Sequence, residues 1–309
     1  MIDLVGKDIL HGAQFTRAEL DHIMDLAADF RAQLEAKKGL DLLDGYVMGA
    51  LFFEPSTRTR LSFETAMHRL GGSVVGFAEA GSTSAKKGES LEDTIRTVDQ
   101  YVDIIAMRHP EIGSAQRAAD VADAPVLNGG DGAGQHPTQA LLDLFTIRDE
   151  CGAVAGKTIV LCGDLKHGRT VHAGVELYKH YDCRLVFVAP EQLRMPAEIT
   201  AGLRGQGIAV EETVDLAGAL RQADVLYMTR IQRERFADPA EYVRLKGSYV
   251  LTREMIERVN PGVVILHPLP RVDEIPTDVD PLSGAAYFRQ VRNGVYTRMA
   301  LIALVMGKL

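Results

Sequence analysis

Hydroxyl and guanidinium side chains are concentrated in one short segment of the chain. Residues 52–64 read FFEPSTRTRLSFE, and four consecutive side chains there can donate hydrogen bonds to an anion: Ser56, Thr57, Arg58 and Thr59. The whole chain has a formal net charge of -8, so an anionic ligand needs cations gathered at one place. Arginine supplies a planar fork that binds phosphate or carboxylate through two hydrogen bonds. The segment therefore predicts an anion-binding site.

The same segment is predicted to open a helix. Ser56, Thr57 and Arg58 stand at the start of a pattern, TRTRLSFETAMHRL, whose end is marked by Gly71 and Gly72. The first backbone N–H groups of a helix have no acceptor within it, and the helix dipole is positive at that end, so both favour an anion. A plainer interpretation is that Ser56 only caps the helix and the arginines are solvated. Polar residues after five other predicted strands favour the anion site.

These polar segments follow apolar runs along the whole chain. They are Arg108 and His109 after IIAM, GGDGAGQHPTQ after VLN, DLKHGRT after VLCG, TRIQRER after VLYM and HPLPR after VVIL. In open parallel sheets, ligands bind beyond the carboxyl ends of the strands. Arginine, histidine, glutamine and hydroxyl side chains from both halves of the chain are therefore expected to converge on one crevice.

The elements that position these residues are short strands alternating with helical patterns. The strand candidates are YVMGALFF, SVVGFA, VDIIAM, APVLNG, KTIVLCG, CRLVFVA, ADVLYMT and GVVILHP. The first helix is predicted from a capping box at Thr16 and Glu19, followed by apolar residues at helical spacing. Strands separated by helices are typical of α/β proteins, in which helices cover both faces of a parallel sheet.

Two domains are expected from the length of 309 residues, because single cores stop growing near this size. A helical pattern ends near residues 148–157 in a glycine- and alanine-rich connector, which predicts the boundary. The last twenty residues read as a helix that is apolar all round its end, so it needs a partner surface. We expect it to return to the first domain.

Composition excludes several classes of protein. Hydrophobic residues make up 46% and charged residues 25%, as in ordinary folded chains. The apolar runs are too short to span a bilayer and the N-terminus has no secretory pattern, so we expect a cytoplasmic protein without a membrane partner. A pI near 5.6 argues against nucleic acid as a partner. Cys151, Cys162 and Cys183 show neither disulfide nor zinc spacing and are expected to be buried hydrophobic residues.

Taken together, these motifs closely resemble those of the transcarbamoylase family over essentially the whole chain. They are FFEPSTRTRLSFETAMHRLGG, TSAKKGES, MRHP, GDGAGQHPTQALLDLFTI, GDLKHGRTVHA, YMTRIQRERF and LHPLPRVDEI. The resemblance implies transfer of the carbamoyl group of carbamoyl phosphate to the α-amine of L-aspartate, giving N-carbamoyl-L-aspartate and phosphate, an early step of pyrimidine biosynthesis. It implies no cofactor and no metal.

The resemblance also implies roles for individual residues. Carbamoyl phosphate would contact Ser56, Thr57, Arg58, Thr59, Arg108, His136, Gln139, Leu269, Pro270 and Arg298. L-Aspartate would contact Lys87, Arg169, Arg230 and Gln232. The catalytic set would be His136, Arg108, Thr59 and Lys87, and a neighbouring subunit would supply Ser84 and Lys87. The loop that holds Lys86 and Lys87 is one residue shorter than in well-known bacterial members, and the adjacent glycine and glutamate favour Lys87. His109, His167 and His267 are expected only to shape turns.

The family architecture implies a carbamoyl phosphate-binding domain over residues 1–150 plus 287–309, and an L-aspartate-binding domain over 151–286. It also implies a homotrimer with shared active sites, with regulatory chains in a larger assembly left open. Two alternatives stay open. One is ornithine carbamoyltransferase, which has a cysteine where this chain has Pro268, and whose acceptor suits Arg230 and Gln232 less well. The other is a catalytically silent anion-binding paralogue.

Overall fold

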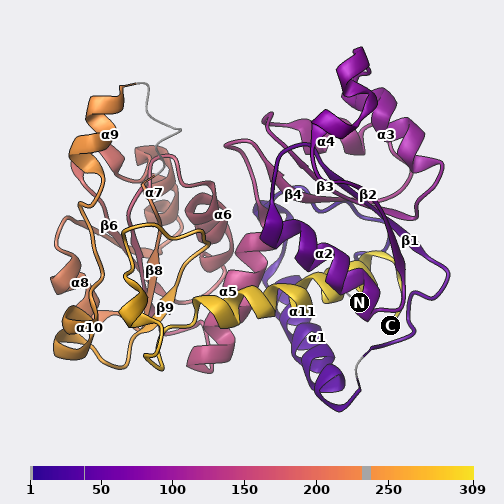
Figure 1. The fold of residues 1–309 in the computed structure, drawn as a ribbon. Coiled ribbons are helices and arrows are strands. Elements are labelled where there is room, and N and C mark those ends of the chain that lie inside the picture. The colour runs from indigo at the N-terminus through magenta and orange to yellow at the C-terminus, as the bar shows by residue number, and fades with distance from the viewer. Residues whose placement is uncertain (1–2, 38, 232–237) are drawn as a thin grey trace. The chain divides into compact units, whose positions relative to one another are not determined.

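The computed structural model describes residues 3–37, 39–231 and 238–309. The chain forms two compact units, each built on its own parallel sheet (Figure 1). Unit 1 comprises Met1–Phe145 and Val291–Leu309, and unit 2 comprises Thr146–Gln290. Both divisions fall inside helices, namely α5 (Pro137–Cys151) and α11 (Tyr287–Val305).

The strands pair in the parallel sense in both sheets, which confirms the predicted α/β class. Unit 1 has the strand order β2-β1-β3-β4, with bounds β1 Val47–Phe52, β2 Ser73–Phe77, β3 Ile104–His109 and β4 Val126–Asp131. Unit 2 has the order β7-β6-β5-β8-β9, with bounds β5 Thr158–Cys162, β6 Arg184–Val188, β7 Ala209–Thr213, β8 Val225–Met228 and β9 Val264–Leu266.

Helices connect these strands as the alternating pattern predicts. The other α-helices are α1 Arg17–Ala36, α2 Thr57–Arg69, α3 Leu91–Asp99, α4 Ser114–Ala119, α6 Arg169–Tyr178, α7 Ala197–Gly205, α8 Leu216–Gln222, α9 Pro239–Leu245 and α10 Arg253–Val259. Short 3-10 helices include η2 (Ala80–Ser82), η3 (Ser84–Lys87) and η6 (Thr277–Val279).

The first helix follows its predicted signals. The Thr16 hydroxyl accepts a hydrogen bond from the Glu19 backbone N–H, and the Glu19 carboxylate reaches back to the Thr16 N–H, so the capping box is confirmed. The apolar face predicted for this helix is buried: Leu20, Ile23, Met24, Ala27 and Phe30.

Side chains of unit 1 alternate between the two faces of its sheet. Leu51 of β1 belongs to the core that contains Ile95 of α3 and Ala118 of α4. Gly49, two residues earlier, faces the Val98 and Val102 side chains at a distance that leaves little room for a Cβ atom. In a strand, residues two apart share a face, so this face of β1 is packed against α3. Figure 1 shows α3 and α4 on one side of the sheet and α2 and α11 on the other.

One core cluster of unit 2 is built in the same way, from strand residues two apart and helices α8 and α10. Val160 and Cys162 of β5 pack with Leu220 of α8 and Ile256 of α10. Strand β7 was missed by the sequence pattern, because AVEET carries two glutamates and lies at an edge of the sheet, where its side chains are only partly covered.

The C-terminal helix α11 packs on unit 1, as expected from its apolar surface. Residues 297–305 are all buried, on every side of the helix.

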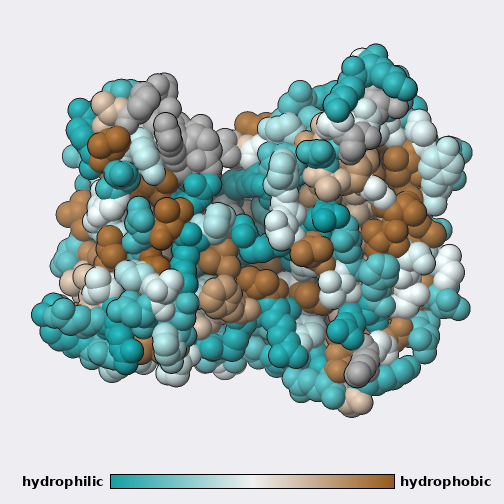
Figure 2. Space-filling view, viewed as in Figure 1, coloured by the Kyte–Doolittle hydropathy of each residue, from teal (hydrophilic) through white to brown (hydrophobic). Residues whose placement is uncertain are grey.

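In unit 1, hydrophobic residues also reach the surface over β1 and β2 (Figure 2), and Val75 of the edge strand β2 is 48% exposed. Among the described helices, none is long and apolar enough to cross a membrane.

The cysteines are free, and two of the three fit the prediction of buried hydrophobic residues. Cys162 and Cys183 are buried, and burial raises the pKa of both thiols, that of Cys183 to about 12, which keeps them unreactive. Cys151 is only half-buried at the end of α5, so the prediction was wrong for that residue.

Candidate functional site

In unit 1, the predicted anion-binding residues lie at the switch point of the sheet. In the strand order β2-β1-β3-β4, the chain leaves β1 toward β2 on one side and leaves β3 toward β4 on the other. The direction of the connections therefore reverses between β1 and β3. Phe52 at the end of β1 is opposite Arg108 of β3, and His109 is opposite Asp131 of β4. The polar segments after these strands therefore start at one edge of the sheet, where ligands of open α/β sheets bind.

Helix α2 begins at this edge with the predicted hydroxyl and arginine residues. Ser56 is the N-cap in an extended conformation, and its side chain makes no capping hydrogen bond. The first hydrogen bond of the helix joins Arg60 N–H to Ser56 C=O over 3.3 Å, so the N–H groups before it point out of the helix end. Thr57 and Arg58 are exposed there, whereas Thr59 is buried, with its methyl group close to Gly129.

The second arginine of the segment has a different environment. Arg60 forms an ion pair with Glu64 one turn later on α2, at 3.0 Å. Arg58 is thus the arginine at the helix terminus, and Arg60 belongs to the helix surface. At the opposite end, the helix closes through Gly71, whose φ of 94° is left-handed, with Gly71 N–H bonded to His68 C=O and Gly72 N–H to Met67 C=O.

Arg108 is held by a carboxylate that the sequence motifs did not single out. Glu54, just after β1, accepts from Arg108 Nε and also lies 2.6 Å from its Nη2. The Arg108 side chain is 16% exposed, so the ion pair is largely shielded from water. The neighbouring His109 accepts the Glu111 N–H at Nδ1 over 3.1 Å, and burial lowers the pKa of His109, which favours this neutral form.

His136 and Gln139 are placed by the start of helix α5. The His136 carbonyl accepts the Gln139 and Ala140 N–H groups, and Pro137 occupies the first helical position. The His136 side chain is only 4% exposed. Gln139 donates through Nε2 to Asp143, which is fully buried, over 2.8 Å. Since the NH2 group of Gln139 points at Asp143, the amide oxygen of Gln139 is turned away from that carboxyl group.

Arg298 lies inside unit 1 at the junction of three helices. Its guanidinium donates to Ser62 of α2 over 3.0 Å, to Thr138 of α5 over 3.2 Å and to the Gly294 carbonyl of its own helix α11. It also stacks on the Phe63 ring at 4.8 Å. Full burial lowers the pKa of Arg298 to about 9 against the opposing charge of Asp143, so the side chain stays cationic at neutral pH.

The loop after β2 carries the two residues predicted to act on a neighbouring subunit. Ser84 and Lys87 lie in η3, and the side chains of Lys86 and Lys87 are exposed. The preceding turn is fixed by Thr83, which donates through its hydroxyl to the Ala80 carbonyl over 2.8 Å.

Unit 2 repeats the arrangement of unit 1, with arginines at the switch point between β5 and β8. Arg169 is the first residue of α6, after a loop held by the buried Asp164, which accepts the His167 N–H over 3.0 Å. Arg230 follows Thr229, whose hydroxyl accepts the Asp164 N–H over 3.1 Å. Asp164 therefore links the segments that carry both arginines, through its carboxylate on the Arg169 side and through its backbone N–H on the Arg230 side. Gln232 lies outside the described residues.

Leu269 and Pro270 form a turn after β9 that His267 organises. His267 Nδ1 accepts the Leu269 N–H over 2.8 Å, and its Nε2 lies 2.7 Å from Glu274. Leu269 has a φ of 56°, which is left-handed and unfavourable for a residue with a Cβ atom. The imidazole and the Glu274 carboxylate therefore stabilise a backbone conformation that is uncommon for a residue with a Cβ atom. His267 shapes this turn, as its sequence context suggested.

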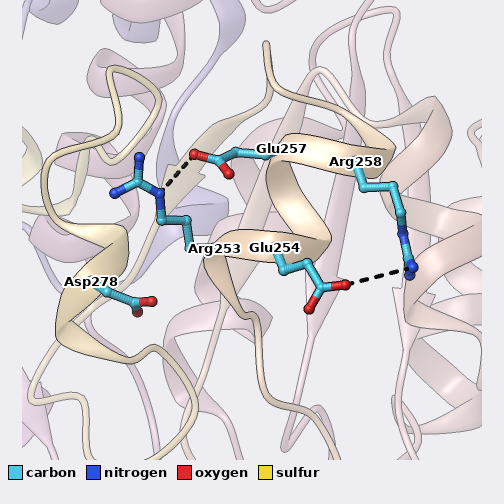
Figure 3. A pocket seen from close by; sticks show the side chains of 5 residues that line it. All are labelled: Arg253, Glu254, Glu257, Arg258 and Asp278. Atoms are coloured by element: carbon cyan, nitrogen blue, oxygen red, sulfur yellow. Dashed lines mark hydrogen bonds and ion pairs between the residues drawn. The ribbon is translucent and has the colours of Figure 1, made fainter.

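A hollow elsewhere on unit 2 does not resemble a ligand site. It is lined by Arg253, Glu254, Glu257 and Arg258 of α10 and by Asp278 of η6 (Figure 3). Arg253 pairs with Glu257 at 2.7 Å and Arg258 with Glu254 at 3.8 Å, all of them well exposed. Within the described part of the chain, no group of three or more His, Cys, Asp or Glu side chains is spaced to hold a metal ion.

Four carboxylates that support the site lie within the quoted motifs, but no role was predicted for them. Glu54, Asp131, Asp164 and Glu274 each accept hydrogen bonds next to a predicted site residue. The sequence could have indicated two of these carboxylates as loop acceptors, because Asp131 and Asp164 each follow a glycine at the end of a strand. A short acceptor in that place satisfies the N–H groups of the loop that leaves the sheet.

Comparisons with known proteins agree with this arrangement. The model of the aspartate/ornithine carbamoyltransferase carbamoyl-P binding domain matches residues 7–149, and that of the Asp/Orn binding domain of the same family matches residues 155–305. An aspartate carbamoyltransferase catalytic subunit of Thermococcus kodakarensis is 52% identical over 308 residues, 100% of this chain and 99% of the relative.

Solved structures show the same similarity. Aspartate transcarbamoylase of Trypanosoma cruzi, in complex with carbamoyl phosphate and aspartate, has a TM-score of 0.93 and 42% identity, covering 98% of each chain. The catalytic subunit of M. Jannaschii aspartate transcarbamoylase has a TM-score of 0.90 and 46% identity, covering 96% of each chain. Both family models, in order and over nearly the whole length, place this chain in the aspartate/ornithine carbamoyltransferase family.

Proposed function

We propose that the chain transfers the carbamoyl group of carbamoyl phosphate to the α-amine of L-aspartate, as a step of pyrimidine biosynthesis. The observation that carries the proposal is the set of donors at the carboxyl ends of β1, β3 and β4, which combines a helix N-terminus with Arg58 and Arg108. This combination suits a phosphate dianion, because backbone N–H groups, hydroxyls and guanidinium forks all donate.

Carbamoyl phosphate binds to unit 1 in this proposal, through its phosphate at Ser56, Thr57, Arg58 and Thr59. Arg108 reaches the phosphate from β3, and its ion pair with Glu54 sets the direction of the guanidinium. His136 donates to the carbamoyl oxygen, and Gln139 accepts from the carbamoyl amide through Oε1. Leu269 and Pro270 offer backbone carbonyls to the same amide. Arg298 acts from below the surface, since its side chain is buried and donates to Ser62, Thr138 and the Gly294 carbonyl.

The chemical step follows from the charges. The neutral α-amine of aspartate attacks the carbonyl carbon, the new N–C bond forms, and the C–O bond to phosphate breaks. The departing phosphate accepts the proton released by the amine. Negative charge develops on the carbonyl oxygen in between, and His136, Arg108 and Thr59 supply donors for it. Removal of one such donor costs about 2.7 to 4 kcal/mol in activation free energy.

L-Aspartate binds to unit 2 through Arg169, Arg230 and Gln232, whose donors match its two carboxylates. The two arginines follow neighbouring strands, as expected for residues that grip one small ligand. The proposed domains are residues 1–150 with 287–309 for carbamoyl phosphate and 151–286 for L-aspartate.

The proposed active unit is a homotrimer in which Ser84 and Lys87 complete the site of a neighbouring subunit. The exposed side chain of Lys87 and the apolar edge at Val75 of β2, just before this loop, support such a contact. A location in the cytoplasm belongs to the same proposal, whereas regulatory chains in a larger assembly stay an open alternative. Light scattering tests the trimer, and cell fractionation tests the location in the cytoplasm.

The decisive assay supplies carbamoyl phosphate with either L-aspartate or L-ornithine and measures phosphate and ureido product. Turnover with aspartate alone is the expected result. Turnover with ornithine would contradict the choice of acceptor, and no turnover with either would favour an anion-binding protein. The His136→Ala variant should lower kcat by about a hundredfold or more while the protein stays folded. Near-normal turnover would remove His136 from the mechanism.

A further inference from the structure

The loop that leads into His136 is closed by one buried carboxylate. Asp131, the last residue of β4, is 5% exposed. Its Oδ1 accepts the Gln135 N–H over 2.5 Å, and its own N–H donates to the Gln135 carbonyl over 3.2 Å. The Asp131 carbonyl accepts the Gly134 N–H over 2.8 Å. The residue immediately before His136 is therefore fixed to Asp131 by two hydrogen bonds.

The other carboxylate oxygen of Asp131 holds a second segment. Its Oδ2 accepts the Gly113 N–H over 2.9 Å at the start of α4. The next residue, Gly132, donates its N–H to the His109 carbonyl over 2.8 Å. A Cβ atom at Gly132 would stand 2.2 Å from the Pro110 carbonyl oxygen, so the loop lies directly against the turn after β3. The carboxylate thus joins the segment that carries His136 to the segment that follows Arg108.

We propose that Asp131 is a positioning residue for His136, which fixes the imidazole relative to the end of β3 through the loop of residues 131–135. The inference rests on the proposed role of His136 as donor to the carbamoyl oxygen. Such a donor is effective only when it is held in place before the charge develops, because reorganisation would consume the stabilisation. Asp131 touches no substrate in this scheme and acts only through His136.

The Asp131→Asn variant tests the carboxylate with a nearly unchanged shape. Asparagine presents one oxygen and one NH2 group, and the NH2 group cannot accept from a backbone N–H. Whichever way the amide turns, the bond to Gln135 or the bond to Gly113 is lost. The matched control is Asp99→Asn. Asp99 also accepts two loop N–H groups in unit 1, from Asp123 at 3.1 Å and Ala124 at 2.9 Å, but this loop precedes the amino end of β4.

The experiment is a double-mutant cycle that combines Asp131→Asn with His136→Ala. It measures kcat and the KM for carbamoyl phosphate. In the wild-type background we expect Asp131→Asn to lower kcat by about tenfold or more, with the KM for carbamoyl phosphate changed by less than about threefold. In the His136→Ala background the same change should cost less than about threefold, because residues that act as a unit are not additive. Asp99→Asn should leave kcat unchanged.

An equal loss of kcat in both backgrounds, or no loss in either, would overturn the inference. If the chain shows no turnover with aspartate, the proposed function is refuted. The role of Asp131 in positioning His136 is then tested by the chemical shifts of the ¹³C-labelled His136 ring. The inference expects these shifts to move with Asp131→Asn and not with Asp99→Asn, and the reverse pattern would refute it. Asp131→Ser, which keeps one acceptor, replaces the asparagine variant if that variant does not fold.

Discussion

Arg298 of α11 donates a hydrogen bond to Ser62 of α2 over 3.0 Å, although 236 residues separate them in the chain. The same guanidinium reaches Thr138 on α5. One buried side chain therefore joins the helix that starts at the hydroxyl and arginine segment to the helix that starts after His136. The C-terminal helix in this way fixes two parts of the candidate site to each other.

Arg298→Lys is expected to destabilise unit 1. Lysine keeps the charge but cannot reach both hydroxyls with one planar group, and a buried cation that loses its partners costs about 3 kcal/mol. Urea unfolding should show a lower midpoint than the wild type. Arg292→Lys on the same helix serves as control, since Arg292 is exposed and donates to Tyr296. Equal midpoints for the two variants would show that the buried hydrogen bonds contribute little.

Gln139→Leu is expected to weaken recognition of the carbamoyl amide. Because Nε2 of Gln139 faces Asp143, its Oε1 is the atom that can accept from the substrate NH2 group. The KM for carbamoyl phosphate should rise by about tenfold, as expected when a buried polar contact is lost. Inhibition by acetyl phosphate, which has a methyl group in place of the NH2 group, should change by less than about twofold.

The control for this prediction has the same local geometry. Gln116 of α4 donates to Asp120 one turn later over 2.8 Å, but on an exposed helix face. Gln116→Leu should leave both constants unchanged. If acetyl phosphate binding weakened as much as carbamoyl phosphate binding in Gln139→Leu, Gln139 would act on the phosphate half of the ligand.

Much of the fold could be predicted because it depends on local patterns. The apolar runs of β1 and β5 are buried on both faces, and such runs are visible in the sequence whatever their partners are. The capping box of Thr16 and Glu19 is equally local. The sequence predicted Arg108 just after a strand, and the structure places it within the end of β3, whereas Arg230 follows β8 as predicted. Both positions follow from the rule that parallel strands end at one edge of their sheet.

Two of the missed contacts join residues that are far apart in the chain. Glu54 pairs with Arg108 across 54 positions, and the Asp164 N–H bonds to Thr229 across 65, so no spacing rule connects them. Strand β7 was not predicted for another reason: an edge strand with little burial needs no run of apolar residues, so its sequence gives no such signal. Partial exposure of Cys151 likewise depends on what covers the end of α5, which composition does not give.

The stability of the turn at Leu269 should depend on pH through Glu274. Burial raises the pKa of this carboxyl, but hydrogen bonds from His267 and the Val272 N–H outweigh it, so the net pKa lies below the ordinary 4.5. A depressed carboxyl pKa contributes stability above the unfolded-state value, and this contribution is lost as pH falls through the folded-state value. The wild type should therefore lose unfolding free energy below a pH of about 4.5.

Glu274→Gln should show a weaker dependence in the same range, because its side chain does not titrate. Urea midpoints measured between pH values of about 6 and 3.5 compare the two proteins. Glu254→Gln on α10 is the control, since that carboxyl is 83% exposed and should keep the wild-type profile. Parallel profiles for wild type and Glu274→Gln would place the acid sensitivity elsewhere.

Mixing two inactive variants should restore activity if Lys87 completes the site of a neighbouring subunit. Lys87→Gln and Arg108→Ala each remove one part of every site in a homotrimer. In a mixed trimer, some sites combine the intact Arg108 of one subunit with the intact Lys87 of the next. Random exchange at equal amounts leaves about a quarter of the sites intact, so about a quarter of wild-type kcat should return. Exchange by mild denaturation and refolding, followed by the aspartate assay, measures it. Activity that stays at the level of the separate variants would mean that Lys87 and Arg108 serve the same subunit's site.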